Sequence, residues 1–371
     1  EAVPGRYLRG AKKVKPRILD EFVANTGLHR KAAIRLLNRP VKRGRKKGGR
    51  PRVYGAILAG VLKVAWEATD CVCSKRLQPF LPELLGILRD RHVITVSDEV
   101  YGQLCSMSPS TIDRLLRQWR SSTQPHGVST TKPGSLLKSA IPIRTFGEWD
   151  GKRPGFVEAD LVSHCGDSPQ GFYLTTLSMV DVATGWFEPV AVRGKGQQRV
   201  RGAVHEARQR LPVPMLGFDS DNGGKFINQA LYEYCRQHQI AFTRSRSFKK
   251  NDSCYVEQKN WAVIRRTIGY HRFSSPKAFD CLRNIYVALR LYVNFFQPVR
   301  KLLSKTRQGA RVYKLYDVAQ TPYRRMVRSG ALSADKAHQL QSIYRVLEPL
   351  RLRQKISEGC EHLWTMADPN G

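Results

Sequence analysis

The stretch LGFDSDNGGKF, Leu216–Phe226, places two aspartates, an asparagine and a Gly-Gly pair directly after a short apolar run. An apolar run that stops at Asn-Gly indicates a buried strand ending in a turn. Acids are scarce in this chain, which has 63 Lys and Arg residues, 30 Asp and Glu residues and a formal charge of +33. The acids of this stretch therefore either shape the turn or hold metal ions against a polyanion.

The composition indicates a folded, multidomain protein with a polyanionic partner. In 371 residues, 41% are hydrophobic and 9% aromatic, which excludes global disorder. The basic residues run through several predicted elements, so nucleic acid is favoured over an anionic membrane. We find no run of about 20 apolar residues and no signal peptide, and expect a cytoplasmic protein. Its eight scattered cysteines are interpreted as reduced thiols.

Elements on both sides of the opening stretch predict an α/β core. Three β-rich runs separated by turn residues predict a three-stranded meander. Helices and strands then alternate, which is the order of an RNase H-like fold. The predicted strands are 155–164, 171–181, 185–193, 214–221 and 240–245, and the predicted helices are 197–210, 225–239 and 253–270.

Three acids occupy distinctive places in this core. Asp160 lies in the middle of the first strand, where an unpaired charge costs several kcal/mol unless it binds a metal or an opposite charge. Asp221 ends the fourth strand, and Glu257 lies in the first turn of the last helix, with 35 residues between them. Carboxylates are the ligands that Mg²⁺ prefers, so the three predict a metal site.

This arrangement resembles the catalytic core shared by retroviral integrases and DDE transposases. DSDNGGKF is similar to the (S/T)-D-N-G-x-x-F strand end of that superfamily, and KKNDSCYVEQKN to its loop and Glu-bearing helix. The resemblance is most specific over Gly155–Tyr270 and extends less specifically to bacterial insertion-sequence transposases. Lys225 departs from the pattern, because many relatives carry an acid there, and the His/His/Cys/Cys zinc module of retroviral integrases is absent.

The resemblance implies metal-dependent DNA cleavage and strand transfer. Two Mg²⁺ ions, replaceable by Mn²⁺, would activate the attacking and leaving oxygens. Asp160 would bridge both ions, while Asp221 and Glu257 would each hold one. Water would free a 3′-hydroxyl at the element's end, and that hydroxyl would attack target DNA. At least two subunits would handle two ends together, in the bacterial nucleoid.

Other polar residues near these acids have competing interpretations. We interpret Glu158 and Asp219 as balancing charge in a basic neighbourhood. Asn260 either supports the site or faces solvent. Lys249, Lys250 and Lys259 are candidate DNA contacts, and solvation explains the first two nearly as well.

The front third predicts two helix-turn-helix segments. The first, in a domain over residues 1–41, has two short helices around Thr26-Gly27, with Ile18, Leu19, Ala33, Leu36 and Leu37 facing inward. Its second helix offers DNA contacts from His29, Arg30, Lys31 and Arg35. A plain helical hairpin would show the same periodicity.

A second such segment lies in the domain over residues 53–120. Ser97 and Ser108 are predicted to cap its two helices, with Pro109 at the first position of the latter. Its candidate DNA contacts are Ser110, Arg114 and Arg117. Between the two domains, residues 42–52 form a basic linker that resembles an AT-hook, with Arg43, Arg45, Arg50 and Arg52 as minor-groove contacts. A solvated spacer fits that linker equally well.

The fold class is therefore multidomain, with all-α helix-turn-helix domains, a linker at 121–150, an RNase H-like core at 151–298 and a mainly α, basic region at 299–371. That last region either contacts DNA or joins subunits. The function predicted is a DNA transposase that binds the ends of a mobile element. The alternatives are a catalytically silent DNA-binding protein derived from a transposase, and a nuclease that cuts without joining.

Overall fold

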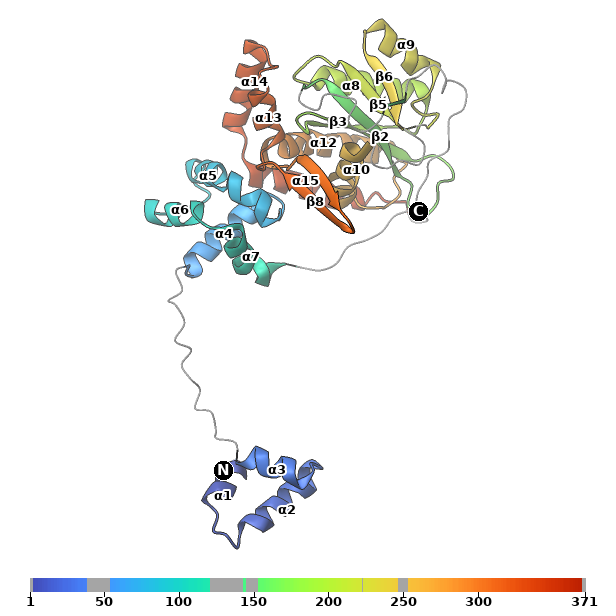
Figure 1. The fold of residues 1–371 in the computed structure, drawn as a ribbon. Coiled ribbons are helices and arrows are strands. Elements are labelled where there is room, and N and C mark those ends of the chain that lie inside the picture. Colours follow the sequence, from blue (N-terminus) through green and yellow to red (C-terminus); the bar gives the residue numbers. More distant parts are fainter. Residues whose placement is uncertain are drawn as a thin grey trace. The chain divides into compact units, whose positions relative to one another are not determined.

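The computed structural model of the chain describes residues 3–38, 54–120, 143–144, 153–221, 223–245 and 253–368. The chain divides into two compact units, Glu1–Tyr54 and Gly55–Gly371, each with its own core. Figure 1 shows the small helical unit and the larger α/β unit. No helix in the described ranges is long and apolar enough to cross a bilayer.

The first unit is a group of three helices. They are α1 (Val3–Arg9), α2 (Lys15–Thr26) and α3 (Arg30–Leu37). Helix α2 ends at Gly27, whose φ of 66° favours glycine, and the His29 ring caps α3 by accepting a hydrogen bond from the backbone N–H of Lys31 at 3.3 Å. Ile18, Leu19, Ala33 and Leu37 are buried with Tyr7 of α1. Leu36, which we predicted to face inward, is 48% exposed.

A six-stranded mixed sheet forms the centre of the second unit. Its order is β1-β6-β5-β2-β3-β4. Strands β2, β3 and β4 are antiparallel neighbours, whereas β5 pairs with both β2 and β6 in parallel. The strands are β1 (Ile143–Arg144), β2 (Phe156–His164), β3 (Leu174–Asp181), β4 (Phe187–Val192), β5 (Gly217–Ser220) and β6 (Ala241–Ser245).

Helices cover this sheet, which confirms the predicted mixed α/β core. Helices α8 (Gln197–Arg210) and α12 (Pro276–Phe296) pack on β4, and α10 (Cys254–Lys259) packs on β2 and β3. The helix of α10 continues through the π-helical segment η3 (Asn260–Arg265) into α11 (Arg266–Ile268). α9 (Gln229–Gln237) connects β5 to β6. Three antiparallel strands followed by two parallel ones agree with an RNase H-like arrangement.

The region after α12, predicted to be mainly α, also contains strands. It begins with a two-stranded antiparallel sheet, β7 (Leu302–Gln308) and β8 (Arg311–Tyr316). Helix α13 (Pro322–Arg328) follows. Two more helices follow, α14 (Ala334–Val346) and α15 (Pro349–Trp364), and Pro349 occupies the first position of the second.

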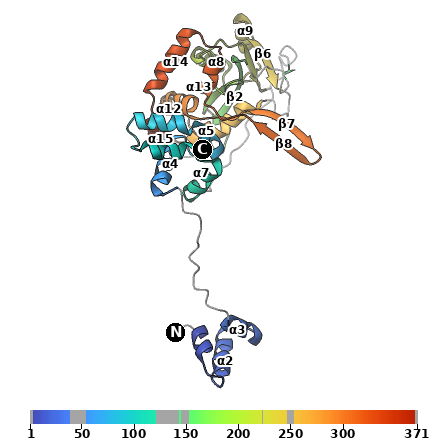
Figure 2. The same ribbon diagram turned by 60° about the vertical axis from the view of Figure 1, so that its left-hand side comes forward.

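In the described part of the second unit, four helices precede the sheet. They are α4 (Ala56–Ala68), α5 (Ser74–Asp90), α6 (Asp98–Cys105) and α7 (Pro109–Leu116), the last running into the 3₁₀ turn η1 (Arg117–Trp119). The side chains of Ser97 and Ser108 accept hydrogen bonds from backbone N–H groups in the first turns of α6 and α7, as predicted. Helix α4 contacts α15, and the two lie close together in Figure 2.

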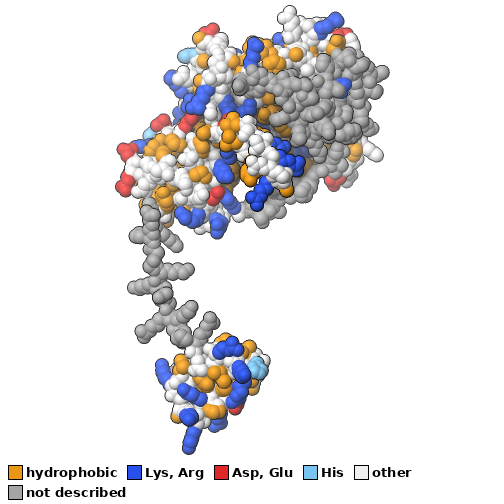
Figure 3. All heavy atoms as spheres, in the orientation of Figure 1, with side chains coloured by type: hydrophobic (Ala, Val, Ile, Leu, Met, Phe, Trp, Pro, Cys, Tyr) orange, Lys and Arg blue, Asp and Glu red, His pale blue; other side chains and the backbone are white. Residues whose placement is uncertain are grey.

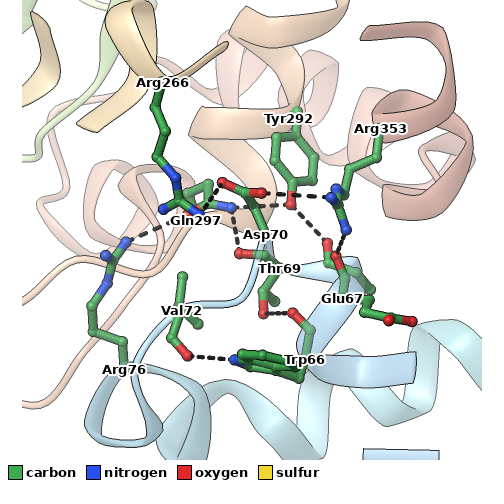
Figure 4. Close-up of polar contacts among 11 residues, drawn as sticks. Trp66, Glu67, Thr69, Asp70, Val72, Arg76, Arg266, Tyr292, Gln297 and Arg353 are labelled. Carbon is green, nitrogen blue, oxygen red and sulfur yellow. Dashed lines mark hydrogen bonds and ion pairs between the residues drawn. The ribbon is translucent and has the colours of Figure 1, made fainter. Parts of the chain in front are cut away.

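A polar network joins the end of α4 to the helices of the core (Figure 4). The Tyr292 hydroxyl donates to the Ala68 carbonyl at 2.9 Å, and the Gln297 amide donates to the Thr69 carbonyl at 2.6 Å. Asp70 forms ion pairs with Arg266 at 3.6 Å and Arg353 at 3.5 Å. Residues from α4, α11, α12 and α15 thus meet at one turn, which fixes the four front helices to the α/β core.

Candidate active site

Two of the three predicted acids face each other across one lysine. The Nζ atom of Lys225 lies 2.8 Å from Asp160 Oδ1 and 3.4 Å from Asp221 Oδ2. All three side chains are largely shielded, with exposures of 13% for Lys225, 26% for Asp160 and 27% for Asp221. Burial opposes the charged form of Lys225, but the two carboxylates outweigh it and raise the pKa of the ammonium. The lysine is therefore a cation held between two acids.

Sheet register brings these acids together. β2 and β5 are parallel, with Ala159 opposite Ser220, so Asp160 and Asp221 come next on neighbouring chains. Beyond Asp221 the chain turns tightly, and the Gly223 backbone N–H donates to Asp221 Oδ1 at 3.1 Å. A Cβ at Gly223 would lie 3.1 Å from that same oxygen. The Gly223 backbone N–H therefore orients the Asp221 carboxylate.

Asp160 also touches the helix that carries Glu257. The Asn260 side-chain amide donates to Asp160 Oδ2 at 2.9 Å. The Asn260 Oδ1 atom is buried and has no hydrogen-bond partner among the described residues, and the same holds for the hydroxyl of Ser178, the cross-strand neighbour of Asp160. Buried polar atoms are nearly always satisfied, so unsatisfied ones beside a carboxylate are typical of a site that takes a ligand. The structure agrees with the interpretation in which Asn260 supports the site.

Glu158 does more than balance charge. It is fully buried, and its Oε2 atom accepts hydrogen bonds from the backbone N–H groups of Tyr255 and Val256 at 3.0 and 3.1 Å. No side chain of α10 itself caps this end. A carboxylate at a helix N-terminus also interacts favourably with the helix dipole. Glu158 therefore anchors the start of α10 to β2. No local pattern predicts this role, because the partners lie 97 and 98 residues away.

Asp219 has a similar internal role. It is buried and accepts a hydrogen bond from the Thr243 hydroxyl of the neighbouring strand at 2.7 Å. Asp219 and Thr243 are directly opposite each other in the sheet, and the bond between them uses one carboxylate oxygen. The structure thus places Asp221, rather than Asp219, beside Asp160.

Glu257 lies on the anchored helix without joining the two aspartates. Its side chain is exposed. It precedes Asn260 by three residues, so the two share one face of the helix. Across the described ranges, no three His, Cys, Asp or Glu side chains approach closely enough to hold one metal ion together.

The residues present fit a cation at two carboxylates. Asp160 and Asp221 converge on a single point, and the ammonium of Lys225 shows that this point accommodates positive charge. Hard divalent cations prefer such oxygen donors and leave positions open for water and phosphate. The Asn260 side-chain oxygen, which has no hydrogen-bond partner among the described residues, is an uncharged oxygen ligand nearby. Asp160 and Asp221 are therefore the residues that would hold a metal ion, with Glu257 one helical turn from Asn260.

The predicted DNA contacts fall into three groups. His29, Lys31, Arg35, Ser110, Arg114 and Arg117 are exposed on or beside α3 and α7. Arg30 is also exposed, but forms an ion pair with Asp20 of α2. The remainder lie outside the described residues: Arg43, Arg45, Arg50, Arg52, Lys249 and Lys250.

Lys259 is the exception, and our prediction of a DNA contact there is wrong. Its side chain is only 6% exposed, and its ammonium lies 5.7 Å from the centre of the Phe187 ring. Burial, with a smaller contribution from Arg76, lowers the pKa of Lys259 to about 7. A position 200° around the helix from Glu257 predicts contact with DNA or solvent, whereas α10 packs on β2 and β3 and the Lys259 side chain lies against Phe187 of β4.

Comparisons with known proteins place the chain in a family. No family model matches it. An uncharacterized protein of Sinorhizobium fredii (strain NBRC 101917 / NGR234), y4rM, is 41% identical over 326 residues, which cover 88% of this chain and 93% of y4rM. The chain belongs to the y4rM family. No activity is known from that relationship, because y4rM is itself uncharacterized.

Solved structures similar to this y4rM-family chain are retroviral integrases. The HTLV-2 integrase catalytic core in complex with magnesium is 18% identical and covers 39% of this chain and 90% of its own, with a TM-score of 0.30. The BIV integrase catalytic core is 16% identical and covers 47% and 95%, with a TM-score of 0.31. A simian T-cell lymphotropic virus intasome is 13% identical and covers 58% and 69%, also with a TM-score of 0.31.

Removing the Lys225 ammonium is expected to strengthen cation binding. In Lys225→Ala the two carboxylates no longer have the ammonium as a counter-ion, so Mn²⁺ does not have to displace it. The attraction between opposite charges near a protein surface reaches about 4 kcal/mol, so Mn²⁺ should bind at least about tenfold more tightly. Electron paramagnetic resonance of free Mn²⁺, without DNA, measures this directly. Lys277→Ala, an exposed lysine on α12, is the matched control. Equal or weaker Mn²⁺ binding in Lys225→Ala would show that the ammonium and the metal do not share a position.

Proposed function

We propose that this protein is a DNA transposase that cuts at the ends of a mobile element and joins the freed 3′-hydroxyl to target DNA. One observation carries the proposal: Asp160 and Asp221 converge on the Lys225 ammonium in the middle of a mixed sheet, and Asn260 links Asp160 to the helix that carries Glu257. The spacing and local sequence of the three acids support the same function. Among the described residues, the Ser178 hydroxyl and the Asn260 Oδ1 atom have no hydrogen-bond partner, which supports a site that takes a ligand beside Asp160.

The proposed roles of the residues follow from their positions. Asp160 and Asp221 hold divalent metal, and Glu257 completes the site by turning inward from the helix face it shares with Asn260. When bound, magnesium would relieve charge on the phosphate and favour deprotonation of the attacking oxygen. Glu158 positions the helix by accepting hydrogen bonds from the backbone N–H groups of its first turn. The exposed cations of α3 and α7 contact the element's ends, and two or more subunits hold both ends together.

The decisive experiment is a strand-transfer assay. The substrate is a pre-cleaved duplex that carries the inverted repeat found next to the coding region, with a supercoiled plasmid as target and Mg²⁺ in the buffer. Joined product supports the proposal. Cleavage without joining would identify a nuclease, and retention of the duplex with neither reaction would identify a catalytically silent DNA-binding protein.

A further inference from the structure

The strands β7 and β8 form a ribbon that the sheet core does not need. The two strands pair only with each other, and every residue from Leu303 to Tyr316 is exposed. The ribbon projects from the body of the molecule in Figure 2. Isolated two-stranded hairpins are at best marginally stable in water. Yet this one carries apolar residues in the open, with Leu303 63%, Leu315 60% and Tyr313 49% exposed. Such a surface calls for a partner.

Charge identifies the chemistry of that partner. The ribbon has four basic residues, Lys305, Arg307, Arg311 and Lys314, and no acid between Leu302 and Tyr316. None of the four forms an ion pair with any residue that the structure describes. Figure 3 shows Lys and Arg side chains gathered where Figure 1 places the ribbon. The partner is therefore anionic.

The register concentrates the charge on one face. Lys305 pairs directly with Lys314, and Arg307 pairs with Val312 two positions along. Side chains of paired residues lie on the same face, as do residues two apart, so three cations share one side. Like charges placed directly opposite each other destabilise a hairpin. Only an anion lying along this face turns that repulsion into attraction.

The ribbon's dimensions match a duplex groove. Strands of seven and six residues, joined by a two-residue turn at Gly309, extend about 20 Å. A two-stranded ribbon fits the major groove of DNA, where lysines and arginines reach phosphates on both sides. Tyr313 and Leu315 lie on the opposite face, available to sugars or base edges. A second copy of this chain is a poor partner, because it carries the same excess of positive charge.

We propose that the β7–β8 ribbon is an arm that binds double-stranded DNA through Lys305, Arg307 and Lys314. The choice of DNA as the partner rests on the proposed function. The arm adds to that function a DNA contact on the catalytic unit, outside the helices of the front third. Its contribution is mainly electrostatic, because lysine and arginine side chains neutralise phosphates whatever the base sequence.

The test is DNA binding by the full chain with Lys305→Thr and Lys314→Thr combined. Threonine favours strands and removes the like-charge pair, so the ribbon keeps its fold. Fluorescence anisotropy with a random duplex of about 40 base pairs, in EDTA and over a salt series, measures affinity without catalysis. We expect the DNA affinity near 0.1 M salt to fall about tenfold or more. The slope of log affinity against log salt concentration should decrease by the amount expected for about two lost phosphate contacts. The matched control, Lys277→Ala with Lys355→Ala, removes the same charge from exposed helix positions and should lose less than half as much.

The outcomes separate the arm from the catalytic proposal. Equal losses in the ribbon variant and its control would overturn the arm, even if the wild type joins DNA. A ribbon variant that loses self-association or binding to phosphatidylserine vesicles, but keeps DNA affinity, would also overturn it. Ribbon-dependent DNA binding without any joined product in the strand-transfer assay would support the arm and overturn the transposase proposal.

Discussion

Asp160→Asn is expected to reduce DNA joining by at least about 1,000-fold, which corresponds to about 4 kcal/mol of transition-state stabilisation. The substitution keeps the size of the side chain but removes the charge that faces Lys225 and Asn260. An amide is a far weaker ligand for Mg²⁺ than a carboxylate, so cleavage and joining should fall together. The strand-transfer assay with a pre-cleaved end measures the joining step alone.

Two controls separate a catalytic effect of Asp160→Asn from a loss of folding or DNA binding. Duplex binding in EDTA should change little, because the loss is chemical and the protein remains folded. Asp167→Asn makes the same substitution at an exposed loop position just after β2 and should join DNA at the wild-type rate. Joining by Asp160→Asn at a rate near that of the wild type would remove the basis of the proposed site.

Arg290→Met should lower the free energy of unfolding by about 3–5 kcal/mol near pH 8. The Nε atom of Arg290 on α12 donates to Glu188 Oε2 on β4 at 2.5 Å, and the Glu188 side chain is fully buried. The Trp186 indole donates to the other carboxylate oxygen at 2.7 Å. Removing Arg290 leaves the buried Glu188 carboxylate without its counter-ion. The free-energy cost of that unpaired charge is larger than the net stabilisation that the ion pair contributes.

The pH dependence of this variant identifies Glu188 as the cause. Burial raises the pKa of Glu188 to about 7, although Arg290 opposes the shift. A raised pKa in the folded state favours folding at low pH, and this advantage is lost as the pH rises through about 7. Arg290→Met should therefore be much less destabilised near pH 5 than near pH 8. Denaturant unfolding followed by circular dichroism measures both, and Arg283→Met, an exposed arginine on the same helix, should shift stability by about 0.5 kcal/mol or less at either pH.

The strands and helices of the core were largely predictable because their signals are local. Runs of β-favouring residues separated by turn residues predicted β2, β3 and β4, and the Asn-Gly pair in the sequence predicted where β5 ends. Ser97 and Ser108 predicted the starts of α6 and α7. The hairpin β7–β8 was missed, because its strands are basic and exposed on both faces and so lack the apolar periodicity by which a strand is predicted.

By itself, the sequence determined the order of the elements and the candidate acids, because hydrophobic period, caps and turns act over a few residues. Only the tertiary structure decided which polar groups meet. Lys225 lies between Asp160 and Asp221, Glu158 caps a helix 97 residues away, and Lys259 is buried under neighbouring elements. The reason is physical: burial and Coulomb interaction depend on distance in space, and strand register across the sheet sets that distance for residues far apart in the chain.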